Sequence, residues 1–265
     1  MTKAIFFDID GTLLSFKTHS VPQSTIDDIN EVKRQGIKVF LATGRLRKQI
    51  QNLGDLEFDG FITVNGAYCV TTDHDVIFKK LIPKEELKSL IEYQQNEVKF
   101  PLAFMLNEGS FVNYIDSNVE KIANLVKVNV PPVRNLEELI DEEVLQVNLY
   151  VDHALEKRIM NEALVSCHAS RWHPTFADVN IKGINKSTGI DKFLEHFGIQ
   201  KSETMAFGDG GNDIEMLRHV AIGIAMGNAG DDVKAAADYV TDDIDDNGVA
   251  NALRHFGLVK GNKSL

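Results

Sequence analysis

This sequence of 265 residues is poor in long apolar runs, in cysteine and in basic residues. No apolar run approaches the roughly 20 residues that a membrane-spanning helix requires, so we expect no membrane partner. The segment MTKAIFFDID reaches an acidic residue too early for a secretory signal, and we therefore expect a cytoplasmic location. The only cysteines, Cys69 and Cys167, show no CxxC or metal-ligand spacing, and we expect two reduced thiols.

Acidic residues outnumber basic residues in this sequence. The sequence has 28 lysines and arginines against 39 aspartates and glutamates, a formal net charge of -11. Binding to a nucleic-acid backbone favours a basic surface, so this balance argues against a nucleic-acid partner. An acidic protein that binds an anion has to attract it locally, with a metal ion or a few well-placed cations. No obligate protein partner is evident from the sequence.

Short apolar segments alternate with helix-like segments at both ends of the chain. Apolar runs at 3–7, 37–42, 61–64 and 204–207 each end in small or polar residues. Runs of this length are typical of strands buried on both faces of a parallel sheet. Strand, helix and strand in succession predict an α/β fold with a doubly wound, Rossmann-like parallel sheet.

The first helix is predicted over residues 21–35. Ile26, Ile29 and Val32 have helical spacing there. Ser24 is the expected N-terminal cap, and Gly36 is expected to end the helix.

The alternation changes in the middle of the chain. Strand-like segments flank a turn at 107–109, and two more, at 169–173 and 176–181, are joined through Pro174. Paired strands of this kind, interleaved with helices, predict an α+β module with an antiparallel sheet. We therefore expect a discontinuous core of residues 1–81 and 184–265, with an inserted α+β domain at 82–183.

Two carboxylates, Asp8 and Asp10, directly follow the first predicted strand and precede Gly11 and Thr12. Ligands of open α/β sheets bind outside the carboxyl ends of the strands, so both side chains are placed where a substrate would bind. One carboxylate can attack phosphorus as a nucleophile, and the other can protonate a leaving alcohol and later deprotonate water. For this motif alone, a turn that merely closes the strand is an equal alternative.

A second acidic motif, GDGGND at 208–213, follows another predicted strand. Asp209 and Asp213 among glycines suit a hard cation such as Mg²⁺, which prefers oxygen ligands. In isolation the motif could equally be an acidic turn or a fragment of a calcium loop, although the full EF-hand spacing is absent. Together with the first motif, the cation site is the better hypothesis.

Candidate ligands for a phosphoryl group occur at two further places. Thr43 and Gly44 follow the strand at 37–42, and a hydroxyl with backbone N–H groups at such a turn can hold phosphate oxygens. Arg45 could add positive charge there, or be a surface residue. Lys186 begins a predicted helix, and its ammonium could neutralise a transferring phosphoryl group, although a lone lysine is usually solvated.

These motifs give the chain a resemblance to a known family. Over essentially its whole length it resembles the haloacid dehalogenase superfamily, and within it the Cof-type phosphatases with a subclass IIB cap. The matching segments are DIDGT, ATGR, GINKSTG and GDGGNDIEM in that order, followed by AMGNA, DDVKAAADYVT and DDNGVANAL. DxDGT is widespread in the superfamily, and its combination with GDGGND and the Asn65-Gly66 turn is much more specific to this branch.

The resemblance implies a Mg²⁺-dependent phosphatase that hydrolyses phosphomonoesters of small metabolites, with sugar phosphates the typical substrates. Asp8 would be the nucleophile and Asp10 the general acid/base. The remaining implied roles are Mg²⁺ binding by Asp8, the backbone carbonyl of Asp10, Asp209 and Asp213, and phosphoryl binding by Thr43, Gly44, Lys186 and Asn212. The insert at 82–183 would be the cap that sets specificity.

Three other functions are compatible with parts of this pattern. A phosphotransferase of the phosphomannomutase type shares the cap subclass. A non-catalytic sugar-phosphate binding protein would lack a motif residue, and none is missing here. A phospho-accepting switch resembling response-regulator receivers is disfavoured, because receivers carry the acceptor aspartate after the third strand rather than the first.

Overall fold

A computed structural model describes residues 1–126 and 128–260. The chain divides into two compact units. We call the first the core; it comprises Met1–Arg45, Ile50–Phe78 and Asn185–Leu265. We call the second the insert; it comprises Leu46–Gln49 and Lys79–Ile184. No helix in the described part of the chain is long and apolar enough to cross a membrane.

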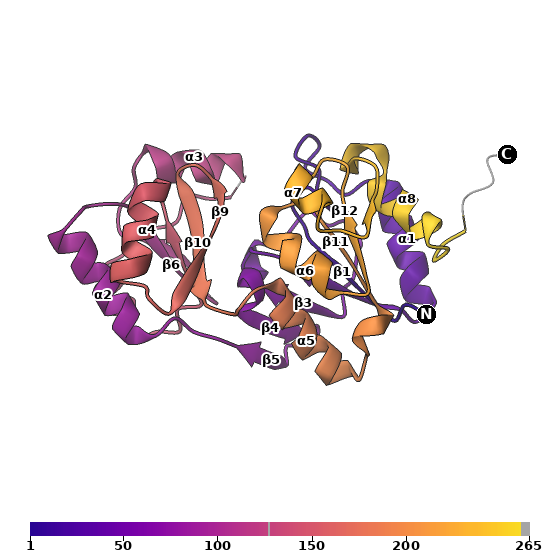
Figure 1. The fold of residues 1–265 in the computed structure, drawn as a ribbon, viewed down its shortest axis with the longest axis horizontal. Coiled ribbons are helices and arrows are strands. Elements are labelled where there is room, and N and C mark those ends of the chain that lie inside the picture. Colours follow the sequence, from indigo (N-terminus) through magenta and orange to yellow (C-terminus); the bar gives the residue numbers. More distant parts are fainter. Residues whose placement is uncertain (127, 261–265) are drawn as a thin grey trace. The chain divides into compact units, whose positions relative to one another are not determined.

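The core is built on an eight-stranded sheet in the order β13-β12-β11-β1-β2-β3-β4-β5 (Figure 1). From β13 to β3 every neighbouring pair is parallel, whereas β3 and β4 are antiparallel. The predicted α/β class is therefore confirmed. The strands are β1 (Ala4–Phe7), β2 (Lys38–Ala42), β3 (Gly60–Thr63), β4 (Tyr68–Thr71), β5 (Val76–Lys79), β11 (Thr204–Gly208), β12 (Ile222–Ala225) and β13 (Tyr239–Val240).

Helices cover both faces of this sheet (Figure 1). In β1, Ile5 and Phe7 pack in one hydrophobic cluster with α1 (Gln23–Arg34) and α8 (Gly248–His255). Ala4 and Phe6 pack in another with α5 (Lys186–Phe197), α6 (Ile214–His219) and α7 (Asp231–Lys234). A strand covered on both sides has no solvent face, which is why the β1 sequence is wholly apolar.

Two details of the core differ from the sequence-based expectation. Helix α1 begins after Pro22, so Ser24 lies inside the helix and its hydroxyl donates to Asn247 Oδ1. The prediction of Ser24 as the cap is wrong, because Pro22 with its fixed φ of -56° already sets the helix start. Gly36, at φ +82°, follows the helix as predicted. The strands β4 and β5 were not expected, since polar residues interrupt their short apolar runs.

The insert contains a five-stranded sheet in the order β7-β6-β8-β10-β9. All its recorded pairings are antiparallel, as predicted. Leu87 of α2 and Ile159 of α4 belong to the hydrophobic cluster on one face of this sheet, and Val119 of α3 belongs to a separate cluster. The elements are α2 (Lys84–Asn96), β6 (Leu102–Leu106), β7 (Gly109–Val112), α3 (Ser117–Leu125), β8 (Gln146–Leu149), α4 (His153–Glu162), β9 (Cys167–His173) and β10 (Phe176–Ile181).

Short 3₁₀ turns complete the described chain, at Arg47–Gln49, Val64–Gly66, Leu136–Leu139, Lys201–Glu203, Gly211–Asp213 and Ile244–Asp246. Two of them, Val64–Gly66 and Gly211–Asp213, carry predicted motif residues. Both cysteines are buried free thiols, as expected.

Candidate active site

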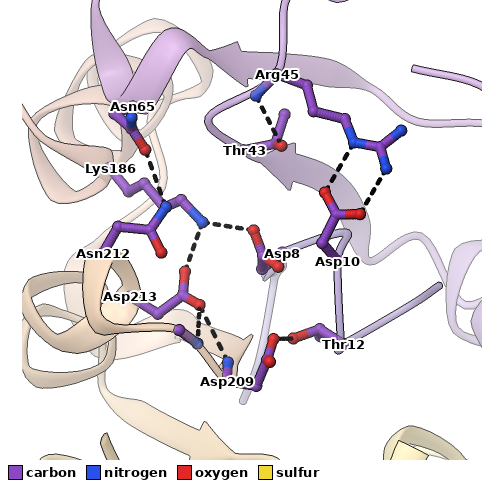
Figure 2. Close-up of polar contacts among 11 residues, drawn as sticks. Asp8, Asp10, Thr12, Thr43, Arg45, Asn65, Lys186, Asp209, Asn212 and Asp213 are labelled. Carbon is purple, nitrogen blue, oxygen red and sulfur yellow. Dashed lines mark hydrogen bonds and ion pairs between the residues drawn. The ribbon is translucent and has the colours of Figure 1, made fainter. Parts of the chain in front are cut away.

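The predicted site residues of the core lie together at the carboxyl ends of three neighbouring strands (Figure 2). Asp8 follows β1, Thr43 follows β2, and Asp209 follows β11. Because β1 pairs in parallel with both β2 and β11, these ends meet at one edge of the sheet. Residues far apart in sequence are thereby brought to one place.

Lys186 is the first residue of α5 and lies at the centre of this group. Asn185 caps the helix, with its side-chain oxygen accepting from the backbone N–H of Thr188 at 3.1 Å. The ammonium of Lys186 donates to Asp8 Oδ1 at 2.5 Å and to Asp213 Oδ1 at 2.6 Å. Its side chain is fully buried, so the possibility that it is a solvated surface lysine is excluded.

Burial and charge act in opposite directions on these groups. Burial raises the pKa of Asp8 well above its ordinary value; Lys186 opposes this shift, and the neighbouring aspartates add to it. Burial alone would lower the pKa of Lys186, but the charges of Asp213 and Asp8 and the hydrogen bonds to them raise it above its usual range. Lys186 therefore carries the positive charge that stabilises an ionised Asp8.

The loop after β11 is organised by Asp213. Its Oδ2 accepts from the backbone N–H groups of Asp209 and Gly210, at 3.0 and 2.9 Å. A Cβ at Gly208 would lie 2.5 Å from the Cβ of Asp213, so only glycine permits this close approach. Asp213 thus fixes the backbone that presents Asp209, and its other oxygen fixes Lys186.

Asp209 is held against the loop that follows β1. Thr12 donates from its hydroxyl to Asp209 Oδ1 at 2.9 Å. Gly11, at φ +84°, lies so close that an added Cβ would be 2.1 Å from Asp209 Oδ2. Burial, followed by the charge of Asp213, raises the pKa of Asp209 to about 7, and the hydrogen bond from Thr12 opposes the shift.

The carboxylates at this edge suit a metal ion. Ligand atoms of Asp8, Asp209 and Asp213 all lie within 4.8 Å of one another. Opposite oxygen ligands of Mg²⁺ are about 4 Å apart, so these groups can surround one cation. The raised pKa values of Asp8 and Asp209 point the same way, because they reflect buried negative charge that a divalent cation would compensate. The side chain of Asp10 is outside this group of three.

Asp10 is instead paired with Arg45. The guanidinium donates from Nε to Asp10 Oδ2 at 2.7 Å and from Nη2 to Oδ1 at 2.5 Å (Figure 2). Sequence reasoning treated Arg45 as a source of charge or a surface residue and missed this pairing. The signal available was its place two residues after Thr43, at the carboxyl end of the strand beside β1.

Two other predicted phosphoryl ligands, Thr43 and Asn212, lie in the same group as Asp8 and Lys186 (Figure 2). Thr43 is buried, and its hydroxyl accepts from the backbone N–H of Arg45 at 3.1 Å. Asn212 donates to Asn65 Oδ1 at 3.0 Å. Gly44 packs against Asn65 too, since an added Cβ would lie 3.2 Å from the same oxygen. Asn65 therefore joins the two loops that carry Gly44 and Asn212.

The raised pKa of Asp209 predicts a pH-dependent stability of the metal-free protein. Between the ordinary carboxyl pKa and about 7, the folded protein binds more protons at Asp209 than the unfolded chain does. The free energy of unfolding should therefore fall as pH rises through this window, by at most about 1.4 kcal/mol per pH unit for this group. We expect a lower melting temperature at pH 8 than at pH 5 in chelator.

Substitution isolates this contribution. Asp209→Asn should make the decline in melting temperature shallower, whereas Asp231→Asn, at an exposed position of α7, should follow the wild type. An equally steep decline in Asp209→Asn would contradict the assignment.

Comparison with known proteins shows the family to which the chain belongs. The family model for haloacid dehalogenase-like hydrolases matches residues 5–253. A curated relative in Bacillus subtilis (strain 168), the 5-amino-6-(5-phospho-D-ribitylamino)uracil phosphatase YcsE, is 30% identical, with 97% of this chain and 96% of that protein covered.

Solved structures give the same result. BT1666 of Bacteroides thetaiotaomicron, a phosphatase of this superfamily, superposes with a TM-score of 0.91 at 44% identity, over 98% of this chain and 96% of that one. BT4131, a sugar phosphatase of subclass IIB, superposes with a TM-score of 0.89 at 46% identity, over 97% of this chain and 100% of that one.

The chain belongs to the haloacid dehalogenase-like hydrolases. Within that class, the relatives found by sequence and by structure confirm the predicted enzyme type, a phosphatase of the haloacid dehalogenase superfamily.

Proposed function

We propose that the protein is a Mg²⁺-dependent phosphatase that hydrolyses phosphomonoesters of small metabolites through an aspartyl-phosphate at Asp8. The observation that carries this proposal is the environment of Asp8. This carboxylate directly follows the central strand β1, contacts a buried ammonium at 2.5 Å, and lies within 4.8 Å of two further carboxylates. This arrangement supports the assignment of a nucleophile, a cation and a metal-binding set to one point.

In the first step, a carboxylate oxygen of Asp8 attacks phosphorus and the bond from phosphorus to the ester oxygen breaks. Asp10, in its protonated form, gives its proton to the departing alcohol. In the second step, Asp10 takes a proton from water, whose oxygen attacks the phosphorus of the aspartyl-phosphate. The bond from phosphorus to the Asp8 oxygen breaks and inorganic phosphate leaves, so that Asp8 is again a carboxylate and Asp10 is again protonated.

The remaining residues hold the phosphoryl group during transfer. Lys186 would balance the charge on its oxygens, as a buried ammonium beside the nucleophile can. The Thr43 hydroxyl, the backbone N–H of Gly44 and the Asn212 amide would donate hydrogen bonds to the same oxygens.

Mg²⁺ would be held by Asp8, the backbone carbonyl of Asp10 and Asp209. Asp213 would assist through a water molecule, while its two oxygens hold Lys186 and the backbone N–H groups of Asp209 and Gly210. When bound, the ion supplies the positive charge that lets an anionic substrate approach anionic Asp8. With Lys186, it accounts for phosphate binding by a protein whose net charge is -11.

The substrate class is proposed from the relatives. One solved relative is a sugar phosphatase, and the curated relative acts on a phosphorylated ribityl compound. Both observations support a small phosphorylated metabolite, with a sugar phosphate the first choice. We propose further that the enzyme acts in the cytoplasm without a nucleic-acid or membrane partner. The insert, residues 82–183 in the sequence-based division, is proposed to set substrate preference.

Phosphate release from a panel of phosphorylated metabolites tests the proposal. We expect release with Mg²⁺, loss of activity in excess chelator, and recovery when Mg²⁺ is restored, because Asp8 and Asp209 need a cation between them and the substrate. Full activity in chelator would contradict the metal assignment. Transfer of phosphate between sugar positions, with little release to water and dependence on an added bisphosphate, would identify a phosphomutase instead.

A further inference from the structure

We propose that Arg45 is a positioning residue that aims the acid/base carboxyl of Asp10. This inference rests on the proposed function, because it gives Arg45 a task only if Asp10 exchanges protons with the substrate. It assigns Arg45 to the leaving group rather than to the phosphoryl group.

The contact between the two side chains is bidentate. Two nitrogens of the guanidinium, Nε and Nη2, each donate to a different oxygen of Asp10, at 2.7 and 2.5 Å. The guanidinium is planar and its donors form a rigid fork, so two parallel hydrogen bonds fix the rotation of the carboxylate as well as its position. A single hydrogen bond would leave that rotation free.

The backbone of Arg45 is itself anchored in the site. Its N–H donates to the Thr43 hydroxyl at 3.1 Å, and its carbonyl accepts from the N–H of Val64 at 3.2 Å. Its side chain is only 16% exposed, whereas that of Asp10 is 35% exposed. The better-fixed partner is therefore the arginine, and the more exposed carboxylate is the group that gains order from the pair.

Order at Asp10 matters for catalysis. Proton transfer needs a heavy-atom separation of about 2.6–3.2 Å between the acid and the leaving oxygen. A misplacement of about 1 Å can cost about 100-fold in rate. When Asp10 carries a proton, its carbonyl oxygen still accepts from one guanidinium nitrogen, and its hydroxyl oxygen keeps a lone pair for the other while its O–H points to the leaving group. The fork can therefore hold the acid form as well as the base form.

The same geometry separates Arg45 from Lys186. The Lys186 ammonium lies 2.5 Å from Asp8 Oδ1, where the phosphoryl group would be bound, while Arg45 donates to Asp10 with two of its three guanidinium nitrogens. The two cations thus serve different ends of the ester bond. Lys186 acts on the phosphoryl group, and Arg45 acts, through Asp10, on the departing alcohol.

Leaving-group dependence tests this division. The alcohol of an alkyl phosphate needs protonation as it departs, whereas 4-nitrophenolate departs without it. We expect Arg45→Met to lower kcat/KM about 100-fold for a sugar or alkyl phosphate. For 4-nitrophenyl phosphate, we expect a decrease of less than about 5-fold, because its leaving group needs no acid. The parameter kcat/KM reports only the steps up to the phosphoryl-enzyme, so the later hydrolysis does not mask the contrast.

Companion variants sharpen the result. Arg45→Lys, which keeps the charge and one hydrogen bond, should restore part of the alkyl-phosphate activity and guards against a folding defect in Arg45→Met. Asp10→Asn should show the same selective loss, and adding Arg45→Met to it should cause little further change, because both act through one group. Arg34→Met is the matched control, since Arg34 is exposed and pairs with Glu31 on α1.

The outcomes distinguish this inference from the function on which it rests. Equal losses for the two esters in Arg45→Met would assign Arg45 to the phosphoryl group and overturn the inference. If the loss of kcat/KM in the double variant equalled the product of the two single losses, the inference would be overturned too. Wild-type protein that cleaves neither ester would overturn the proposed function, and the inference with it.

Discussion

Asp8→Asn is expected to abolish phosphate release, with kcat falling by at least about 1,000-fold, as expected when a covalent nucleophile is removed. The amide is a poor nucleophile, and no phosphoryl-enzyme can form on it. The substitution is isosteric, and the amide oxygen can still accept from Lys186, which at 2.6 Å also keeps its bond to Asp213. The fold should therefore survive, which a melting curve and circular dichroism would show.

The matched control is Asp27→Asn on α1, where Asp27 is exposed and only accepts from Gln23. It should keep full activity. A trapping experiment separates mechanism from binding: brief incubation with radiolabelled substrate and acid quenching should label the wild type and not Asp8→Asn. Near-normal turnover in Asp8→Asn would rule out the aspartyl-phosphate.

Lys186→Met should cost both activity and stability. Lys186 is fully buried between Asp8 and Asp213, so its loss leaves two buried carboxylates without their shared cation. Removing one partner of a buried ion pair typically costs about 3–5 kcal/mol in the free energy of unfolding. Chemical denaturation in chelator would measure this loss, and phosphate release should be undetectable.

A double variant tests the reason for that loss. Lys186→Met combined with Asp213→Asn removes one of the two uncompensated charges, so it should recover part of the stability but none of the activity. Recovery of activity would contradict the role of Lys186. If Lys186→Met alone unfolded as easily as the wild type, the ion pairs seen in the structure would contribute no net stability.

Much of the core and its motifs could be predicted because the information is local. Strand β1 carries apolar residues such as Phe6 and Phe7 because both of its faces are covered. The apolar run therefore marks the strand, and Asp8 directly after it marks the strand end. Parallel pairing then brings strand ends to one edge, so Thr43 and Asp209 could be placed near Asp8 without knowing any side-chain contact.

The contacts that could not be predicted depend on side-chain direction across distant segments. Whether Arg45 turns to solvent or to Asp10 is decided by packing between two loops, which the residues around Arg45 do not encode. Asn65 has φ +53°, a backbone state that favours Asn and Gly, yet its bond to Asn212 is visible only in three dimensions. The helix start at Pro22 was missed because Ser24 satisfied the capping rule equally well.

The place of β1 at the centre of the sheet has a consequence for how the chain is made. Its two neighbours, β2 and β11, come from opposite ends of the sequence, and Thr12 is separated by 197 residues from Asp209, which it contacts. At about 5–20 residues per second, a ribosome needs roughly 10–40 s to synthesise that interval. During this time β1 can pair with β2 but has an open apolar edge on its other side. The growing polypeptide thus keeps an aggregation-prone strand edge exposed until β11 emerges.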